Sequence, residues 1–383
     1  MHRRSKVWGL GFVFAALTVG VWAQTSPSAP LQAPTGRKQL PLTVDADPVP
    51  SPDPDTAPGA APNAVPTDRD VVKENGKFLL HENAYEVRLN ASVIDSSGRA
   101  VDSLPKEAFR VYEDGVVQNI LSFRHEDLPV SLGILIDSSG SMIEKKSAVD
   151  AASINLVKLS NPADEAFLVD FNSEAYIDTD FTSDIGKLQQ GLGLVHVGGG
   201  TALYDAVVAS ADYLSKNAKQ PKQVLLLITD GDDNASSAVL EAAIERVQDL
   251  DGPAIYCIGL LFGDDSDRRE NRHAKEVLQE LAEQTGGQAY FPKSLREVSD
   301  ITTEVAQDIR TQYTIAYRST KSPALGGYRV VHVEAKEKGF RGLQVRTRTG
   351  YYPKVASTNP PPGGAVVVPP VVTPSEPAPA SGR

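Results

Sequence analysis

A doubly wound α/β domain with a mostly parallel central sheet is the fold that the sequence predicts for residues 128–310, flanked by a smaller β-sandwich-like region. Three observations predict it. Apolar runs alternate with helical patterns, and the runs are nearly continuous, as in strands buried on both faces. Short polar motifs follow the runs directly. Ligands bind at the carboxyl ends of the strands in sheets of this kind, so those motifs are the candidate site.

The elements of the central domain follow in chain order. Buried strands are expected at Val130–Ile136, Ala166–Phe171, Val224–Ile228 and Ile255–Leu261. Helices are expected at Met142–Leu159, Ala202–Ser215, Ala238–Leu250 and Ala274–Gln284, where the apolar spacing is helical. The alternating segment Ala175–Thr179 predicts an antiparallel edge strand.

Two β regions, residues 80–126 and 311–353, flank this domain. Each contains alternating apolar and polar residues, and Asp114-Gly115 marks a hairpin turn in the first. Neither region alone is long enough to form a stable domain. We therefore expect strands from both to pair into one β-sandwich built from a discontinuous segment.

The two ends of the chain predict export and spacing. Residues 1–23 resemble a signal peptide, with a basic start and the apolar run Val7–Trp22, and we expect cleavage after Ala23. The alternative is an uncleaved anchor, but the run is shorter than the roughly 18 residues of a membrane span. Residues 24–75 and 354–383 are rich in proline and small residues and predict disordered spacers. The expected location is periplasmic or secreted, with no membrane span after cleavage.

Composition narrows the class of function. A hydrophobic fraction of 41% in 383 residues is enough for a buried core. The formal charge of −11 argues against nucleic-acid binding, which needs a basic face. Cys257 is the only cysteine and lies in an apolar run, so the fold forms without an internal disulfide.

Three polar motifs are expected to meet at one edge of the sheet. Asp137-Ser138-Ser139-Gly140-Ser141 follows the first strand, Gly198–Thr201 opens a helix, and Thr229-Asp230-Gly231 follows the strand Val224–Ile228. We expect each motif to lie at a strand end. The side chains expected to converge on one metal ion are Asp137, Ser139, Ser141, Thr201 and Asp230.

The residue types in these motifs suit a hard cation. Carboxylate and hydroxyl oxygens are the ligands that Mg²⁺ prefers, with Mn²⁺ and Ca²⁺ as alternatives. Alternation directs Asp137, Ser139 and Ser141 to one point, while Ser138 is expected to point elsewhere and Gly140 to allow a sharp backbone. Two carboxylates only balance a divalent charge. Five side chains, used directly or through water, leave one coordination position that an acidic group of a partner could occupy.

This residue set resembles the metal-ion-dependent adhesion site of von Willebrand factor A domains, and the resemblance covers about half of the chain. Flanking residues, including Phe109–Glu113 and Tyr351-Tyr352-Pro353, are similar to a group of secreted bacterial proteins of the acidobacterial type that carry such domains. The resemblance implies a protein-binding module in which an Asp or Glu of a partner completes the metal shell. It implies no catalysis.

A purely structural interpretation of the same residues stays open at this point. Ser141 and Thr201 stand where helix N-caps would, and Asp137 and Asp230 are turn-forming residues. The chain also repeats part of the first motif at Asp95-Ser96-Ser97-Gly98, where Arg99 replaces the last serine. We interpret that copy as a structural turn.

Residues near the motifs receive structural interpretations. Asp232-Asp233-Asn234 is expected to be a solvated loop, Asp205 to complement a helix dipole, and His196 to lie on the rim. Residues 264–267 are interpreted as solvated acidic surface because an EF-hand's glycine and glutamate are missing. The glycines Gly198–Gly200 lack the lysine of a phosphate loop, so no nucleotide is expected.

The sequence therefore predicts a non-enzymatic, metal-dependent binding module of adhesion type outside the cytoplasm. Two alternatives remain. One is a structural scaffold in which the metal only makes the loops at the carboxyl ends of the strands rigid. The other is a metal-assisted hydrolase, for which the sequence offers no motif that places a general base beside the ion.

Overall fold

The computed structural model describes residues 86–159, 161–262 and 268–354, and the backbone of three short strands, β1 (Lys38–Gln39), β2 (Asp70–Glu74) and β3 (Lys77–His81). The predicted signal peptide lies outside the described residues, as do most of the predicted N-terminal spacer and all but Lys354 of the predicted C-terminal tail. In the part of the chain that is described, no helix has both the length and the apolar character needed to cross a membrane.

The central sheet is mostly parallel, as predicted. Its strand order is β1, β9 (Ala175–Thr182), β8 (Glu165–Phe171), β7 (Val130–Asp137), β10 (Lys222–Thr229), β11 (Ala254–Gly259) and β12 (Ala289–Tyr290). β9 is antiparallel to β8, which confirms that expectation. It is not the edge of the sheet, however, because β1 from the predicted spacer pairs with its other side. Following the chain from β7, the strands β8 and β9 are added on one side of it and the strands β10, β11 and β12 on the other. The strand order therefore reverses at β7.

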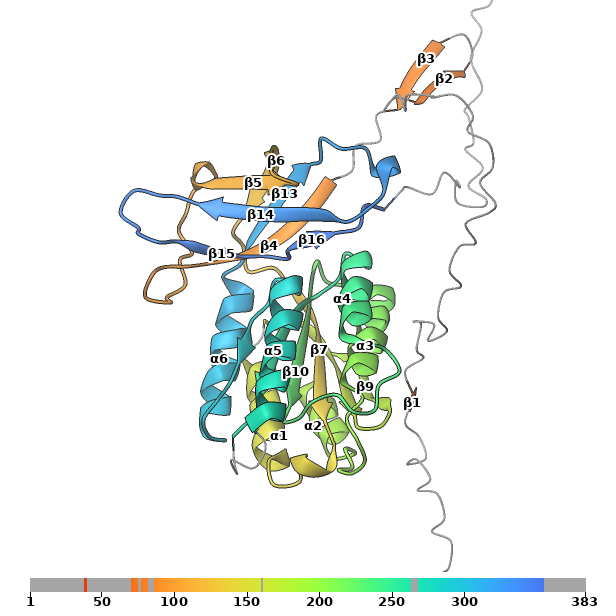
Figure 1. Ribbon diagram of the computed structural model, residues 1–383, viewed down its shortest axis with the longest axis vertical. Helices are drawn as coiled ribbons and strands as arrows, with labels where there is room; N and C mark the ends of the chain where they lie inside the picture. Colours follow the sequence, from red (N-terminus) through yellow and green to blue (C-terminus); the bar gives the residue numbers. More distant parts are fainter. Residues whose placement is uncertain are drawn as a thin grey trace, which may run out of the picture. The chain divides into compact units, whose positions relative to one another are not determined.

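Helices cover both faces of the central sheet (Figure 1). One face packs against α1 (Lys146–Lys158), α2 (Ile185–Leu192) and α6 (Glu297–Arg310). The other packs against α3 (Leu203–Asn217), α4 (Leu240–Asp249) and α5 (Arg268–Thr285). The inner strands β8, β7, β10 and β11 are buried at nearly every position and are mostly apolar, because helices cover both of their faces.

The first predicted helix is divided in the structure. A short 3₁₀ helix, η2 (Gly140–Met142), follows β7, and α1 begins only at Lys146. The sequence also missed α2, α6 and β12. Two of these are short, with eight and two residues, and short elements carry little periodic signal.

The flanking β regions pair with each other, as expected. Their strand order is β15 (Gln344–Arg346), β4 (Glu86–Ile94), β13 (Tyr313–Arg318), β6 (Val116–Arg124), β5 (Phe109–Glu113), β14 (Arg329–Ala335) and β16 (Gly350–Tyr351). β13, from after the central domain, lies between β4 and β6, from before it. The strands form one curled antiparallel sheet around its own apolar core, where we had expected two facing sheets.

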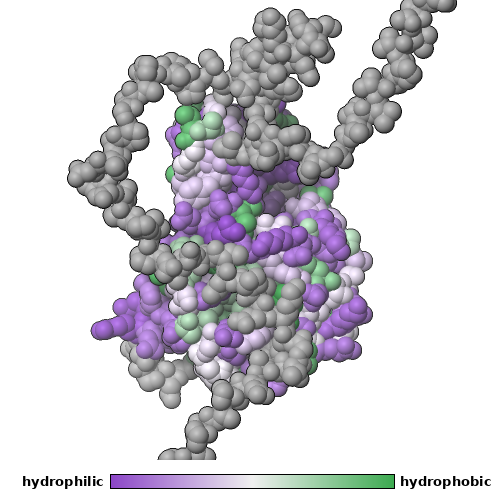
Figure 2. Space-filling model, turned by 90° about the vertical axis from the view of Figure 1, so that its right-hand side faces the viewer, coloured by the Kyte–Doolittle hydropathy of each residue, from purple (hydrophilic) through white to green (hydrophobic). Residues whose placement is uncertain are grey.

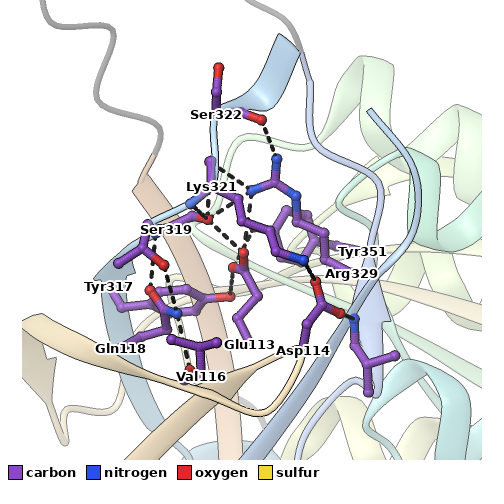
Figure 3. A network of polar contacts seen from close by, with 12 residues as sticks. Glu113, Asp114, Val116, Gln118, Tyr317, Ser319, Lys321, Ser322, Arg329 and Tyr351 are labelled. Atoms are coloured by element: carbon purple, nitrogen blue, oxygen red, sulfur yellow. Dashed lines mark hydrogen bonds and ion pairs between the residues drawn. The ribbon is translucent and has the colours of Figure 1, made fainter. Parts of the chain in front are cut away.

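A buried polar network joins four strands of this second sheet (Figure 3). Glu113 accepts hydrogen bonds from Tyr317 and Tyr351, both at 2.8 Å, and from Ser319 at 2.6 Å. Arg329 forms an ion pair with the same carboxylate at 3.3 Å, and both side chains are nearly or fully buried. The network thus ties segments from both sides of the central domain to one carboxylate.

Candidate metal centre

The candidate site lies at the carboxyl ends of β7 and β10. These strands are parallel neighbours, with Ile136 beside Ile228 in the register. Asp137 is the last residue of β7, and Asp230 follows the last residue of β10. The fold therefore brings two carboxylates that are 93 positions apart in the sequence to the same edge, at the point where strand order reverses.

Asp137 is held rigidly from two sides. Its Oδ1 accepts the Ser139 backbone N–H at 2.8 Å, and its Oδ2 accepts the Thr229 hydroxyl at 2.6 Å. The residue is only 1% exposed. Burial raises the pKa of its carboxyl; the hydrogen bonds from Thr229 and Ser139 oppose the rise, and the nearby Asp230 charge adds to it. A cation beside this carboxylate would relieve the cost of its buried charge.

The two serines of the first motif connect it to Asp230. Ser139 Oγ and Ser141 Oγ are 3.1 Å apart, and Ser141 Oγ donates to Asp230 Oδ1 at 2.8 Å. These contacts form a continuous chain of oxygen atoms from the first motif to the third. The predicted convergence of alternate side chains is therefore present in this loop.

The two intervening residues have different roles. Ser138 points away from the site, as expected, and its hydroxyl donates to Asp170 Oδ2 at 2.9 Å and to the Phe171 carbonyl at 3.1 Å. Gly140 lies in the tight turn of η2, but this turn does not require glycine. The φ of Gly140 is not positive, and a Cβ there would meet nothing within 4 Å. The turn is made by the 3₁₀ geometry of η2, which most residues can adopt.

Thr201 reaches the site from a loop that is not at a strand end, which corrects the prediction. α2 separates the preceding strand from this loop, and Thr201 lies two residues before α3. The residue is 3% exposed, and its Oγ1 lies 3.9 Å from the position that a Cβ on Gly231 would take. Thr201 thus lies beside the loop that carries Asp230, although no direct hydrogen bond joins the two side chains among the described contacts.

The capping interpretation of the hydroxyl residues is not supported by the geometry. The N-cap of η2 is Ser139 and that of α3 is Ala202, and neither helix has a side-chain capping bond. α1 begins at Lys146, several residues beyond Ser141. Asp137 does close a turn through the Ser139 N–H, but only one of its oxygens is used in this way.

The repeated motif at Asp95 is structural, as interpreted. Its Oδ1 accepts the backbone N–H groups of Ser97 at 2.8 Å and Arg99 at 3.1 Å, and Arg99 also pairs with Oδ2 at 3.1 Å. The hydrogen bonds from Ser97 and Arg99 lower the pKa of the Asp95 carboxyl. All of these contacts are local. The sequence Asp-Ser-Ser-Gly therefore forms a simple turn at Asp95, whereas at Asp137 it is part of a cluster of three loops.

The loop after Asp230 positions Thr201, a role that the sequence did not reveal. Asn234 Oδ1 accepts the Thr201 N–H at 2.9 Å, and the Asn234 N–H donates to the Thr201 carbonyl at 3.0 Å. A Cβ on Gly200 would lie 2.7 Å from Asn234 Oδ1, so glycine allows this close approach. Asp233-Asn234 is therefore part of the site's framework and not a merely solvated loop.

Two aspartates complete this framework. Asp205 accepts the backbone N–H groups of Ser237 at 2.8 Å and Ala238 at 2.9 Å, and Asp233 accepts that of Tyr204 at 3.1 Å. Asp205 therefore anchors a loop, beyond the helix-dipole role that we expected. The sequence signal that could have found these residues is their position, since all lie within five residues of Thr201 or Asp230.

Replacing Asn234 with alanine is expected to weaken Mg²⁺ binding by about 10–100-fold, the usual range for residues that orient metal ligands. The loss follows because the Thr201 backbone loses the acceptor that fixes it. Calorimetric titration measures the effect. Asn217→Ala is the matched control, because its amide donates only to the Tyr213 carbonyl within α3, at 2.7 Å. Equal weakening by both substitutions would contradict the positioning role.

Lys145 is the site residue that sequence reasoning missed altogether. Its Nζ lies 2.5 Å from Asp230 Oδ2. His196, by contrast, is an exposed loop residue whose Nδ1 faces the Leu194 carbonyl at 2.5 Å, in agreement with its interpretation as rim. The acidic segment 263–267 lies outside the described residues.

The donor set fits a hard divalent cation. Two carboxylates and three hydroxyls are all oxygen donors, and the carboxylates can balance a charge of +2. The residues that would hold the ion are Asp137, Ser139, Ser141, Thr201 and Asp230. The backbone bonds to Asp137 and Thr201 hold their side chains in place before any ion binds.

Part of the central domain matches a known protein family. A family model described as von Willebrand factor type A domain matches residues 132–232, which include the whole candidate centre. No curated protein matches the chain.

Several solved structures are similar at low identity. A von Willebrand factor type A protein from Catenulispora acidiphila has 14% identity over 70% of this chain and 75% of that chain, with a TM-score of 0.41. The von Willebrand domain of the type V pili tip protein Mfa5 from Porphyromonas gingivalis has 14% identity over 48% and 95%, with a TM-score of 0.39. The PilB minor pilin from Streptococcus sanguinis has 13% identity over 48% and 62%, with a TM-score of 0.37. Residues 132–232, which lie within the central α/β domain and contain its candidate centre, thus match the von Willebrand factor type A family, and the doubly wound sheet described above agrees with that match.

Proposed function

We propose that this chain is an extracytoplasmic, metal-dependent protein-binding module of adhesion type. Its three loops hold Mg²⁺, or alternatively Mn²⁺ or Ca²⁺, and an Asp or Glu of a protein partner completes the metal shell. The observation that carries the proposal is the bonded chain Ser139–Ser141–Asp230 at the adjoining ends of two parallel strands. When bound, the ion supplies a positive centre for an anionic oxygen.

The surface beside the centre supports protein binding. Ile143, two residues beyond Ser141, is 65% exposed. The view in Figure 2 shows a described surface that is mostly hydrophilic, with small scattered hydrophobic groups. The exposed isoleucine offers a protein partner an apolar contact beside the ionic one.

We also propose that the centre is not an enzyme active site. Two acidic side chains beside the three loops, Asp205 and Asp233, accept backbone N–H groups and so serve the framework. The acidic balance of −11 supports the proposal that nucleic acid is not a partner. The proposed export rests on the basic start and apolar run of residues 1–23, and the proline-rich ends would act as spacers around the domain.

Calorimetric titration with Mg²⁺ tests this function. Saturable one-site binding is expected in the wild type and is expected to be lost in Thr201→Ala. Asp95→Ala is the matched control, since it alters the second copy of the motif, whose contacts are local. Acetate, as the simplest carboxylate, is expected to tighten Mg²⁺ binding, because coupling between two ligands is reciprocal.

The possible outcomes separate the candidate functions. No Mg²⁺ binding by the wild type would refute the metal centre. Equal loss in Thr201→Ala and Asp95→Ala would refute its location. Binding that acetate leaves unchanged would favour the scaffold, in which the ion only stabilises the loops.

A further inference from the structure

The positively charged side-chain ammonium of Lys145 lies at the candidate metal centre. Its Nζ is 2.5 Å from Asp230 Oδ2, while Ser141 Oγ donates to Asp230 Oδ1 at 2.8 Å. Each oxygen of Asp230 is therefore already bonded within the chain. The Asp230 side chain is fully buried and that of Lys145 is 18% exposed, so water screens this pair only weakly.

The ammonium is held in this position from several directions. The Lys145 backbone N–H donates to the Met142 carbonyl at 3.0 Å, which fixes the residue at the end of the η2 turn. The Phe262 ring centroid lies 5.9 Å from Nζ, at cation–π range. The lysine thus reaches the centre from the same segment as Ser139 and Ser141, and an aromatic ring supports its charge.

We infer that Lys145 competes with the divalent cation for Asp230 and thereby sets the metal affinity of the centre, an inference that rests on the proposed function. The ammonium and the divalent cation both favour the Asp230 carboxylate, and the two positive charges repel each other. A centre with Asp137 and Asp230 alone would balance a divalent ion. With Lys145 present, the occupied centre carries one net positive charge.

This residual charge has a consequence for the ligand. A neutral oxygen donor leaves the occupied centre positively charged, whereas a carboxylate neutralises it. Lys145 therefore makes the bare ion bind weakly and the ion with an acidic group bind well. Lys145 thus couples the binding of the metal to the binding of the acidic partner.

The test compares single lysine substitutions in the purified protein by calorimetric titration with Mg²⁺. Lys145→Met is expected to tighten Mg²⁺ binding at least tenfold, and Lys145→Arg, which keeps the charge, is expected to leave binding weak. Lys146→Met is the matched control. That neighbour has the same charge, but its Nζ donates to Asp150 at 2.6 Å and to the Leu192 carbonyl at 3.0 Å. It should change the affinity by less than twofold.

The melting temperature, measured with and without Mg²⁺, is a second readout that distinguishes a change in metal affinity from poor folding of the variant. Lys145→Met leaves Asp230 buried without its counter-charge, so the metal-free variant is expected to melt lower than the wild type and to gain more from Mg²⁺. Unchanged or weaker Mg²⁺ binding in Lys145→Met, beside a wild type that binds, would overturn the inference and leave the proposed function standing. Binding in Lys145→Met but not in the wild type would support the inference and refute the metal dependence of the natural protein. No binding in any variant would overturn both.

Discussion

Glu113→Gln is expected to lower the free energy of unfolding by about 3–5 kcal/mol, the usual cost of removing one partner from a buried ion pair. The substitution keeps the shape of the side chain but leaves the Arg329 guanidinium, 2% exposed, without its carboxylate. Tyr317 and Tyr351 also lose a charged acceptor. Burial, followed by the bond to Glu113, raises the pKa of Tyr351 to about 12, so this tyrosine remains a donor at neutral pH.

Urea unfolding followed by circular dichroism and tyrosine emission measures this effect. Tyrosine emission is usable because both tryptophans, Trp8 and Trp22, belong to the predicted signal peptide. Glu107→Gln, at an exposed position before β5, is the matched control and is expected to leave the unfolding midpoint unchanged. A loss below about 1 kcal/mol in Glu113→Gln would show that the network does not hold the second sheet together.

Asp137→Asn is expected to abolish Mg²⁺ binding while it stabilises the metal-free protein. The amide keeps an acceptor for the Ser139 or Thr229 donor but removes a negative charge from a residue that is 1% exposed. At a Mg²⁺ concentration 100 times the dissociation constant, the wild type should gain about 2.7 kcal/mol of stability. The variant should gain none.

The pH dependence of the metal-free protein follows from the same carboxylate. Burial raises the pKa of Asp137 in the folded state, so the folded protein holds a proton that the unfolded chain releases. This residue's contribution to stability is therefore complete below the unfolded pKa and is lost as pH rises through the raised folded pKa. Asp137→Asn is expected to flatten that decline in thermal melts. A decline that persists unchanged in the variant would show that other groups cause it.

Much of the fold could be predicted because burial on both faces leaves a plain signal. β7 and β10 are buried at nearly every position and mostly apolar, and the polar motifs that follow them therefore stand out. β1 and β12 could not be predicted, because two residues carry no period. The curled second sheet depends on pairing between strands more than 200 positions apart, and local patterns do not encode such pairing.

The sequence indicated the five residues of the candidate centre but not the residues around them. Asp137, Ser139 and Ser141 act through a local turn, which spacing alone can indicate. Lys145 could not be predicted, because it acts through Asp230, a residue in a distant segment. A lysine at the start of a helix reads as solvated until the loop after β10 brings Asp230 to within 2.5 Å of its Nζ.

The central claim is that one divalent cation sits among the three loops, and a crystal of the protein grown with Mn²⁺ tests it most directly. We predict one strong anomalous peak at bonding distance from the Ser139 and Ser141 hydroxyls, beside Thr201, with the Ser139–Ser141 contact replaced by bonds to the ion. A peak elsewhere would contradict the claim. So would a crystal saturated with Mn²⁺ in which the Ser139, Ser141 and Asp230 side chains remain bonded only to one another.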